Sequence, residues 1–167
     1  MTSNLNKRCL PVLGLWLLAV FTVAPVLAHD PGKERRQVLP FNQSTWSSMM
    51  QSGSKPAAYL FTTTYCSVCP QVFAELRAAS RSMRPIPALH VVMIDAQGDE
   101  ALRHAGHFPG LTRLYAFDGF EPAIREAVDP AWPNVTPYVV LVDARGQTQR
   151  VIGPPSAQML RHWLTAK

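Results

Sequence analysis

The chain of 167 residues has only three cysteines, no internal repeat and no low-complexity run. A small scaffold held by disulfides would carry several widely spaced cysteine pairs, so this class of protein is disfavoured. The formal net charge is +5, but the charges are scattered and no basic stripe is interleaved with aromatic residues. We therefore expect no nucleic-acid partner. With 47% hydrophobic and 16% charged residues, the composition indicates one globular domain with its own core.

Charged residues are also absent from residues 9–28, directly after the basic pair Lys7 and Arg8. A basic start, an apolar stretch and small residues at its end predict a signal peptide over residues 1–28, cleaved after Ala28. The mature protein would then be periplasmic or secreted. The alternative is an uncleaved membrane anchor, since about 20 apolar residues can also span a bilayer. We expect a linker over residues 29–38 and a globular domain over residues 39–167.

Two of the cysteines, Cys66 and Cys69, are separated by only two residues, after an apolar run of strand length and before apolar residues at helical spacing. The unpaired amide hydrogens in the first turn of a helix favour a thiolate over a thiol, which lowers the pKa of a cysteine at this junction. A disulfide between the two would close too short a loop to constrain the unfolded chain much. We interpret the pair as a thiol-disulfide exchange site that needs no cofactor. Cys66 is expected to attack, and Cys69, one turn into the helix and more buried, to resolve the mixed disulfide.

Hydrophobic periodicity predicts alternating strands and helices along the domain. Strands are expected at residues 39–41, 57–62, 90–94, 138–142 and 147–152, and residues 111–117 also fit a strand. Helices are expected at residues 44–51, from the cysteines to Arg84, at 99–105 with Gly106 as its cap, at 121–128, and after an N-cap at Ser156.

The predicted order is strand, helix, strand, helix, strand, helical insert, strand, strand, helix. Such alternation predicts an α/β fold with a central mixed sheet and helices on both faces. The sheet is expected to be parallel in its first part and to close with an antiparallel hairpin. The apolar run at residues 90–94 predicts a central strand that is covered on both faces.

Three features together resemble the thioredoxin superfamily over residues 41–167. They are Cys66-Ser-Val-Cys69 after a strand, Thr136-Pro137 before a strand, and a closing hairpin and helix. The resemblance implies a thioredoxin-like fold with a cis Thr136–Pro137 peptide bond packed beside the two sulfurs. In such a site the backbone before the proline pairs with an extended substrate segment. We therefore expect Tyr65, Thr136 and Pro137 to bind substrate.

The site departs from the superfamily pattern at three places. Tyr65 replaces the tryptophan that usually precedes the first cysteine, Ser67-Val68 replaces Gly-Pro, and Leu60 stands where a buried acid usually lies. Without that acid the proton of the second thiol must leave by another route, so general reduction in the manner of thioredoxin is not implied. The residues between the cysteines tune the redox potential, and the direction of exchange stays open.

The predicted export and the insert between Met93 and Val139 are similar to the TlpA-like or redoxin branch, whose members work on cytochrome c maturation or metal-centre assembly. This resemblance implies protein thiols and disulfides in the periplasm as partners, together with a membrane or soluble redox partner.

Metal binding is the alternative interpretation of the cysteine pair. Residues 61–70 also resemble copper chaperones of cytochrome oxidase assembly, and Cu(I) prefers soft ligands such as Cys66 and Cys69. Those chaperones have three residues between their cysteines and use a distant histidine, so the ligand set here is incomplete. Zinc needs four ligands, and His104 and His107 are the nearest approach to further ones. We assign no metal ligand from the sequence.

Overall fold

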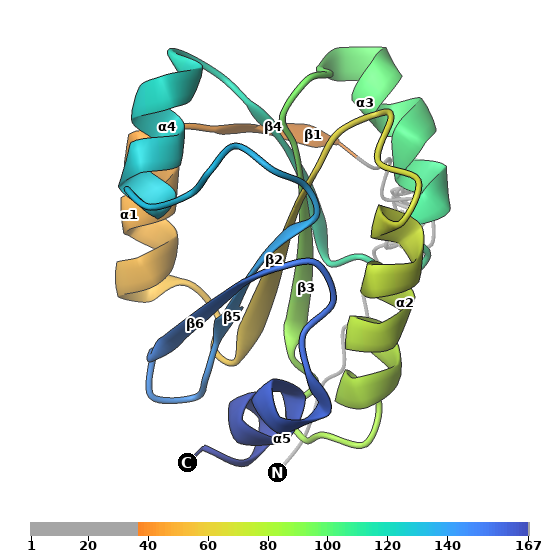
Figure 1. The fold of residues 1–167 in the computed structure, drawn as a ribbon, viewed down its shortest axis with the longest axis vertical. Helices are drawn as coiled ribbons and strands as arrows, with labels where there is room; N and C mark the ends of the chain where they lie inside the picture. The colour runs from red at the N-terminus through yellow and green to blue at the C-terminus, as the bar shows by residue number, and fades with distance from the viewer. Residues whose placement is uncertain (1–36, 167) are drawn as a thin grey trace, which may run out of the picture. The chain divides into compact units, whose positions relative to one another are not determined.

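The computed structural model describes residues 37–166, which form a six-stranded sheet with helices on both faces (Figure 1). The strands are β1 (Val38–Phe41), β2 (Ala57–Thr62), β3 (Ala88–Met93), β4 (Arg113–Phe117), β5 (Tyr138–Val142) and β6 (Thr148–Ile152). The helices are α1 (Gln43–Ser52), α2 (Cys69–Ser80), α3 (Gly98–His104), α4 (Glu121–Val128) and α5 (Ala157–Thr165), with a short 3-10 helix η1 (Ala105–His107). The predicted signal peptide, its alternative as an anchor, and most of the predicted linker lie outside the described residues. Within residues 37–166, no helix has the length and apolar character needed to cross a membrane.

The sheet is mixed, and its strand order is β1-β4-β3-β2-β5-β6. β1, β4, β3 and β2 run parallel, whereas β5 pairs antiparallel with β2, and β6 with β5. The predicted parallel part with a closing hairpin is confirmed, and β3 is central, as its continuous apolar run predicted. The carboxyl ends of β2, β3 and β4 therefore meet the start of β5 at one edge of the sheet, and Cys66 and Cys69 follow β2 at this edge.

β2 shows how one strand contributes to two cores. All of its residues are buried, and successive side chains of a strand point to opposite faces. Leu60 packs in one cluster with Val72 and Phe73 of α2, while Tyr59 and Phe61 pack in a second cluster with aromatic residues of β1 and α1. α2, α3 and α5 cover the first face, and α1 and α4 cover the second (Figure 1). This burial on both faces fixes the register of β2 and hence the place of the cysteines that follow it.

α2 is shorter than predicted, because it ends at Ser80 instead of Arg84. The Ser80 hydroxyl donates to the Arg77 carbonyl at 3.1 Å, and the Met83 N–H donates to the Ser80 carbonyl at 3.1 Å. The chain thus leaves the α-helical pattern for a tight turn. Arg84 also precedes Pro85, and the residue before a proline is disfavoured in a helical conformation. The apolar spacing continues past the point at which the backbone turns, so periodicity alone placed the end too late.

The predicted helical insert contributes a strand to the sheet. β4 pairs in parallel with β1 on one side and β3 on the other, and its last four residues are buried. β4 begins at Arg113, later than residue 111; just before it, the Thr112 N–H donates to the Leu89 carbonyl at 2.6 Å and the Thr112 hydroxyl accepts the Leu89 N–H at 2.8 Å. α3 tightens into η1 at Ala105, so Gly106 lies inside that turn and does not cap the helix as predicted.

Candidate functional site

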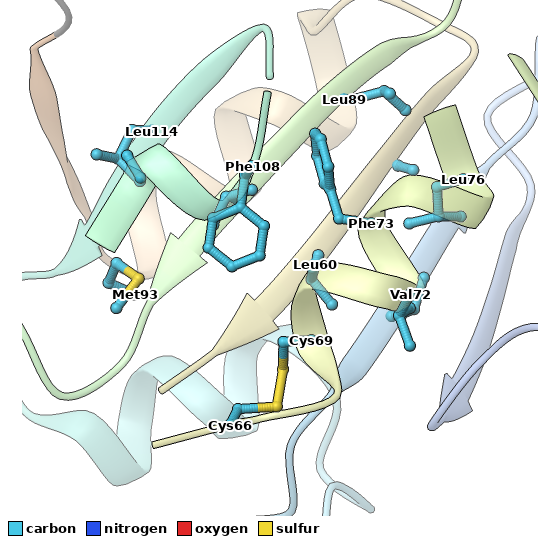
Figure 2. Close-up of a cluster of buried hydrophobic side chains, with 14 of the residues drawn as sticks. Leu60, Cys66, Cys69, Val72, Phe73, Leu76, Leu89, Met93, Phe108 and Leu114 are labelled. Atoms are coloured by element: carbon cyan, nitrogen blue, oxygen red, sulfur yellow. A yellow bond between two sulfur atoms is a disulfide. The ribbon is translucent and has the colours of Figure 1, made fainter. Parts of the chain in front are cut away.

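Cys66 and Cys69 form a disulfide at the amino-terminal end of α2, with their Cα atoms 5.5 Å apart (Figure 2). After β2, a tight turn forms in which the Cys66 N–H donates to the Thr63 carbonyl at 3.2 Å. The Cys69 N–H then donates to the Cys66 carbonyl at 3.3 Å, and α2 begins at Cys69. Pro70 fits the first turn, because the amides there have no intrahelical partner and its missing N–H costs nothing.

The two cysteines differ in burial. Cys66 is 9% exposed, whereas Cys69 is 0% exposed and packs with Val72 and Phe73 in the core (Figure 2). Cys69 is therefore the more buried cysteine, as predicted, although it is the first residue of the helix and does not lie one turn inside it. The small exposed surface of the pair therefore belongs to Cys66. This difference favours Cys66 as the sulfur that exchanges with other molecules.

Leu60 occupies the position at which the superfamily has a buried acid. It is fully buried and lies in the same apolar cluster as Cys69. An alkyl side chain cannot accept a proton, so in the reduced protein the Cys69 thiol has to lose its proton to water, to another group of the protein or to the partner.

The turn before Cys66 is held by a carboxylate. Asp95, just after β3, accepts the Thr64 N–H at 3.0 Å with each of its two oxygens and the Thr64 hydroxyl at 2.7 Å. These bonds tie the segment that leads to Cys66 to the end of the neighbouring strand. No sequence pattern pointed to Asp95, because the two residues are 31 positions apart.

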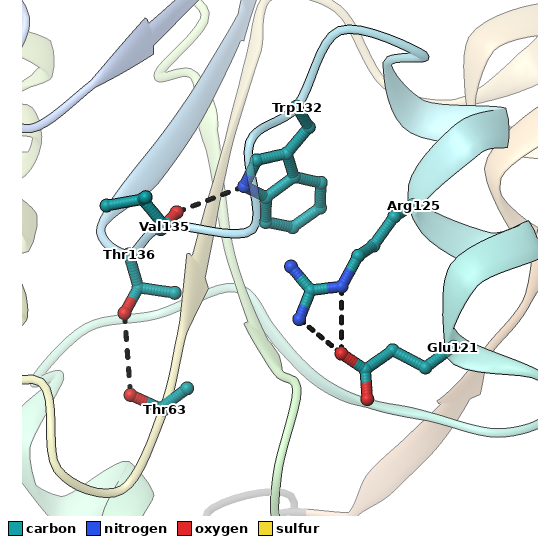
Figure 3. Close-up of polar contacts among 6 residues, drawn as sticks. All are labelled: Thr63, Glu121, Arg125, Trp132, Val135 and Thr136. Carbon is teal, nitrogen blue, oxygen red and sulfur yellow. Dashed lines mark hydrogen bonds and ion pairs between the residues drawn. The ribbon is translucent and has the colours of Figure 1, made fainter.

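The segment before β5 lies against the same turn. The Thr136–Pro137 peptide bond is cis, as the resemblance implied. The hydroxyls of Thr136 and Thr63 lie 3.4 Å apart (Figure 3), and Tyr138 pairs with Phe61 of β2. Pro137 is buried, and its carbonyl accepts the Gly153 N–H at 2.9 Å. Two of the predicted substrate-binding residues, Thr136 and Pro137, are thus brought next to the turn that carries Cys66.

The segment before β5 is also anchored by Asp129. The Asp129 carboxylate accepts hydrogen bonds from the Tyr138 hydroxyl and from the Ala131 N–H, and its Oδ2 lies 3.9 Å from Nε of Arg150. Burial raises the pKa of Asp129, but the Tyr138 and Ala131 hydrogen bonds and the Arg150 charge together hold it below its ordinary value. Burial and the bond to Asp129 raise the pKa of Tyr138. Both groups therefore keep their hydrogen bond at neutral pH.

Exposed apolar side chains gather at this edge of the sheet. Tyr65 is 80% exposed, Val68 is 52% exposed and Val135 is 44% exposed, and these residues lie in the two segments that flank the disulfide. Phe120, which follows β4, and Ile152, which ends β6, are exposed at the same edge. A concentration of exposed apolar side chains is typical of an interaction surface.

His104 and His107 line a shallow cavity of about 270 Å³ together with Thr64, Glu100 and Arg103. Their ring centroids are 5.1 Å apart, and burial, followed by the His107 charge, lowers the pKa of His104. Among residues 37–166, no group of three or more His, Cys, Asp or Glu side chains could hold a metal ion. The two histidines therefore do not extend the ligand set of the cysteine pair.

Two solved structures share this architecture. A thioredoxin-related protein from Neisseria meningitidis serogroup B is 13% identical, with a TM-score of 0.54 over 75% of this chain and 94% of its own. A thiol:disulfide interchange protein of the thioredoxin family from Chlorobium tepidum TLS is 15% identical, with a TM-score of 0.50 over 66% of this chain and 80% of its own. At these identities the similarity is evidence of a shared fold.

No family model matches the chain. A curated cytidine deaminase from Mannheimia succiniciproducens is 28% identical over 153 residues, which are 78% of this chain and 52% of that protein. The chain thus spans about half the length of this relative.

Proposed function

The chain has a thioredoxin-like fold that carries a Cys66–Cys69 disulfide, and from this premise we propose that it is an exported thiol-disulfide oxidoreductase that exchanges this disulfide with partner proteins. The observation that carries the proposal is the place of the disulfide. It lies at the start of a helix, where Cys66 is 9% exposed and Cys69 is fully buried. Export rests on the sequence of residues 1–28, which has the pattern of a signal peptide.

The reaction in the reducing direction takes two steps. The Cys66 thiolate attacks one sulfur of the partner's disulfide, which breaks that bond, forms a mixed disulfide and releases the partner's other sulfur as a thiolate that takes up a proton. The Cys69 thiolate then attacks the Cys66 sulfur, forms the Cys66–Cys69 bond and releases the partner's second thiolate. Two electrons pass to the partner, and the reverse sequence oxidises a partner dithiol.

The partner is proposed to dock as an extended segment beside the disulfide. The Thr136 N–H makes no hydrogen bond to another residue of the described chain, so it is available to such a segment. The exposed apolar side chains of Tyr65, Val68 and Val135 would cover the partner's apolar residues next to its cysteine. Main-chain hydrogen bonds and apolar contacts depend little on the partner's sequence, so this mode of docking suits several different partners.

The resemblance to the TlpA-like branch supports periplasmic partners, such as proteins whose cysteines are prepared for cytochrome c or metal-centre maturation. A membrane or soluble redox protein would restore the starting state of the disulfide after each turnover.

Neither metal-dependent function has support from the described residues. A zinc deaminase needs three His or Cys ligands, and residues 37–166 bring no group of three or more metal-binding side chains together. For the same reason, Cu(I) would have only the two sulfurs of the pair among these residues. We therefore do not propose deamination or copper delivery.

A trapping experiment tests the proposed exchange. In a Cys9→Ser background, Cys69→Ala leaves Cys66 as the only thiol, so the attack on a protein disulfide stops at the mixed disulfide. With insulin as the disulfide substrate, we expect a covalent adduct that dithiothreitol releases.

The matched control is Cys66→Ala, which leaves only the buried Cys69 and is expected to form no adduct. An adduct with Cys66→Ala alone would reverse the two roles. If neither variant forms an adduct, and the unaltered disulfide does not open reversibly in glutathione buffers, the proposed function is wrong.

A further inference from the structure

The segment of residues 133–137 joins Trp132 to Tyr138. It belongs to no helix or strand, and Pro133, Asn134 and Val135 are exposed. Asn134 has a φ of 61°, in the left-handed region that asparagine tolerates better than most residues. The proposed docking mode requires this segment to have one orientation, so some side chain has to supply it.

Trp132 makes a hydrogen bond into this segment. Its indole N–H donates to the Val135 carbonyl at 3.0 Å (Figure 3). The carbonyl of Val135 and the N–H of Thr136 belong to the same planar peptide unit. Fixing the direction of the carbonyl therefore fixes the direction of the Thr136 N–H, which points the opposite way in that plane.

The indole is itself held in place by rings and a charge. It stacks on Tyr138 with a centroid distance of 4.4 Å and an angle of 15°, and Phe61 meets it edge-on at 4.9 Å. The guanidinium of Arg125 lies 4.8 Å from its centroid, and Glu121 binds that guanidinium in turn (Figure 3). Trp132 is only 7% exposed, so it is a rigid donor.

We propose that Trp132 is a positioning residue that aims the Thr136 N–H at the partner polypeptide, and that it thereby sets the affinity for protein substrates without acting on the sulfurs. This inference rests on the proposed function. Trp132 touches neither cysteine, whereas its hydrogen bond ends on the peptide unit that the docking mode uses. Its loss is therefore expected to change binding of a polypeptide and to leave the chemistry of small thiols unchanged.

Two matched tryptophan variants separate orientation from stability. Trp132→Phe keeps an aromatic ring against Tyr138 and removes the N–H donor. Trp163→Phe is the control, because the Trp163 indole also donates to a backbone carbonyl, that of Val142 at 2.9 Å, but Val142 is the last residue of β5, at the far end of the strand. Trp163 is buried, so its substitution costs at least as much stability.

The assay uses the full chain in a Cys9→Ser background. The oxidised protein reacts with a reduced, unfolded polypeptide that has two cysteines, or with dithiothreitol, and the redox potential is measured against glutathione. For Trp132→Phe we expect the apparent KM for the polypeptide to rise about threefold to tenfold, the range that loss of one hydrogen bond predicts. The limiting rate, the dithiothreitol rate and the potential are expected to stay unchanged, and Trp163→Phe is expected to change none of the four.

Each other outcome overturns a defined statement. An unchanged KM in Trp132→Phe, or equal changes in both tryptophan variants, would overturn the positioning role and leave the proposed function standing. A chain that reacts with neither reagent would overturn the proposed function and this inference with it. If Trp132→Phe does not fold, Arg125→Met removes the cation from the indole and is expected to raise the same KM by a smaller factor; an unchanged KM there overturns the inference.

Discussion

Thr63 and Thr136 are 73 positions apart in the sequence, yet their hydroxyl oxygens lie 3.4 Å apart. Thr63 begins the turn that ends at Cys66, and Thr136 immediately precedes Pro137. The contact therefore joins the turn that carries the disulfide to the segment that is proposed to dock the partner. Thr63 is 4% exposed, so water has little access to this side of the pair.

A double-mutant cycle measures this contact. Thr63→Val and Thr136→Val each keep the shape of the side chain and remove its hydroxyl. We expect each variant to lower the free energy of unfolding by about 1 kcal/mol, with a coupling of about 0.5 kcal/mol, because 3.4 Å is long for a hydroxyl pair. Urea denaturation of the oxidised protein and of the three variants gives the four values. Strict additivity of the two single changes would show that the hydroxyls do not interact.

Most of the fold could be predicted from the sequence, because the signals for its strands and helices are local. The apolar runs that became β2, β3 and β5 are buried on both faces, and Ser156 caps α5 by accepting the Met159 N–H, as predicted. The cysteine pair is a motif visible in the sequence, and the cis peptide bond before Pro137 was implied by the resemblance to the thioredoxin superfamily. The order of these elements predicted an α/β fold with a mixed sheet, and the resemblance to the thioredoxin superfamily implied its thioredoxin-like form.

The supporting residues of the site could not be predicted, because their contacts are distant in sequence or depend on the exact turn of the chain. In the sequence, nothing distinguishes Asp95 from the other aspartates, and only the parallel pairing of β2 with β3 brings it to Thr64. Trp132 lies only three residues before Val135, but no sequence pattern around this tryptophan predicts which carbonyl its indole N–H will bond to. Residues 111–117 fitted a strand, but the place of β4 in the sheet could not be predicted, since both of its neighbours are non-local.

Asp95 is expected to stabilise the turn before Cys66. Asp95→Asn keeps the size of the side chain, but it replaces one acceptor oxygen by an NH₂ group that cannot accept the Thr64 N–H. We expect a loss of about 1 kcal/mol in the free energy of unfolding, near the low end for a charged acceptor because Asp95 is exposed. Hydrogen exchange of the Thr64 amide should become faster.

Asp118→Asn is the matched control for Asp95. Asp118 is also an exposed aspartate just after a strand, and its carboxylate bonds to no other residue of the described chain. Asp118→Asn should leave both the free energy of unfolding and the exchange rate of the Thr64 amide unchanged. Equal effects from the two substitutions would show that general loss of negative charge, and not the bond to Thr64, is responsible.

His90 makes the stability of the domain depend on pH. It is 8% exposed, its ring stacks on Tyr59 at 4.9 Å, and its Nδ1 is buried without a hydrogen-bond partner among the described residues. Burial, followed by the charge of Arg113, lowers the pKa of His90 from 6.5 to about 4. Tyr59 stays neutral in this range, because burial and then Tyr115 raise its pKa to about 12.

The direction of the pH effect follows from which state binds the proton. Between pH 6.5 and about pH 4 the unfolded chain protonates His90 while the folded domain does not, so acid favours unfolding. We expect the free energy of unfolding to fall by about 3 kcal/mol as the pH falls through this window, and His90 to contribute no pH dependence above it. His90→Phe keeps an aromatic ring against Tyr59 and cannot titrate. His104, whose pKa is also lowered, is present in both proteins, so the difference between their urea denaturation curves isolates His90. The difference in unfolding free energy should be constant above pH 6.5, and below it should change steadily in favour of the phenylalanine variant. A difference that stays constant down to pH 4 would mean that His90 becomes protonated in the folded domain as easily as in the unfolded chain.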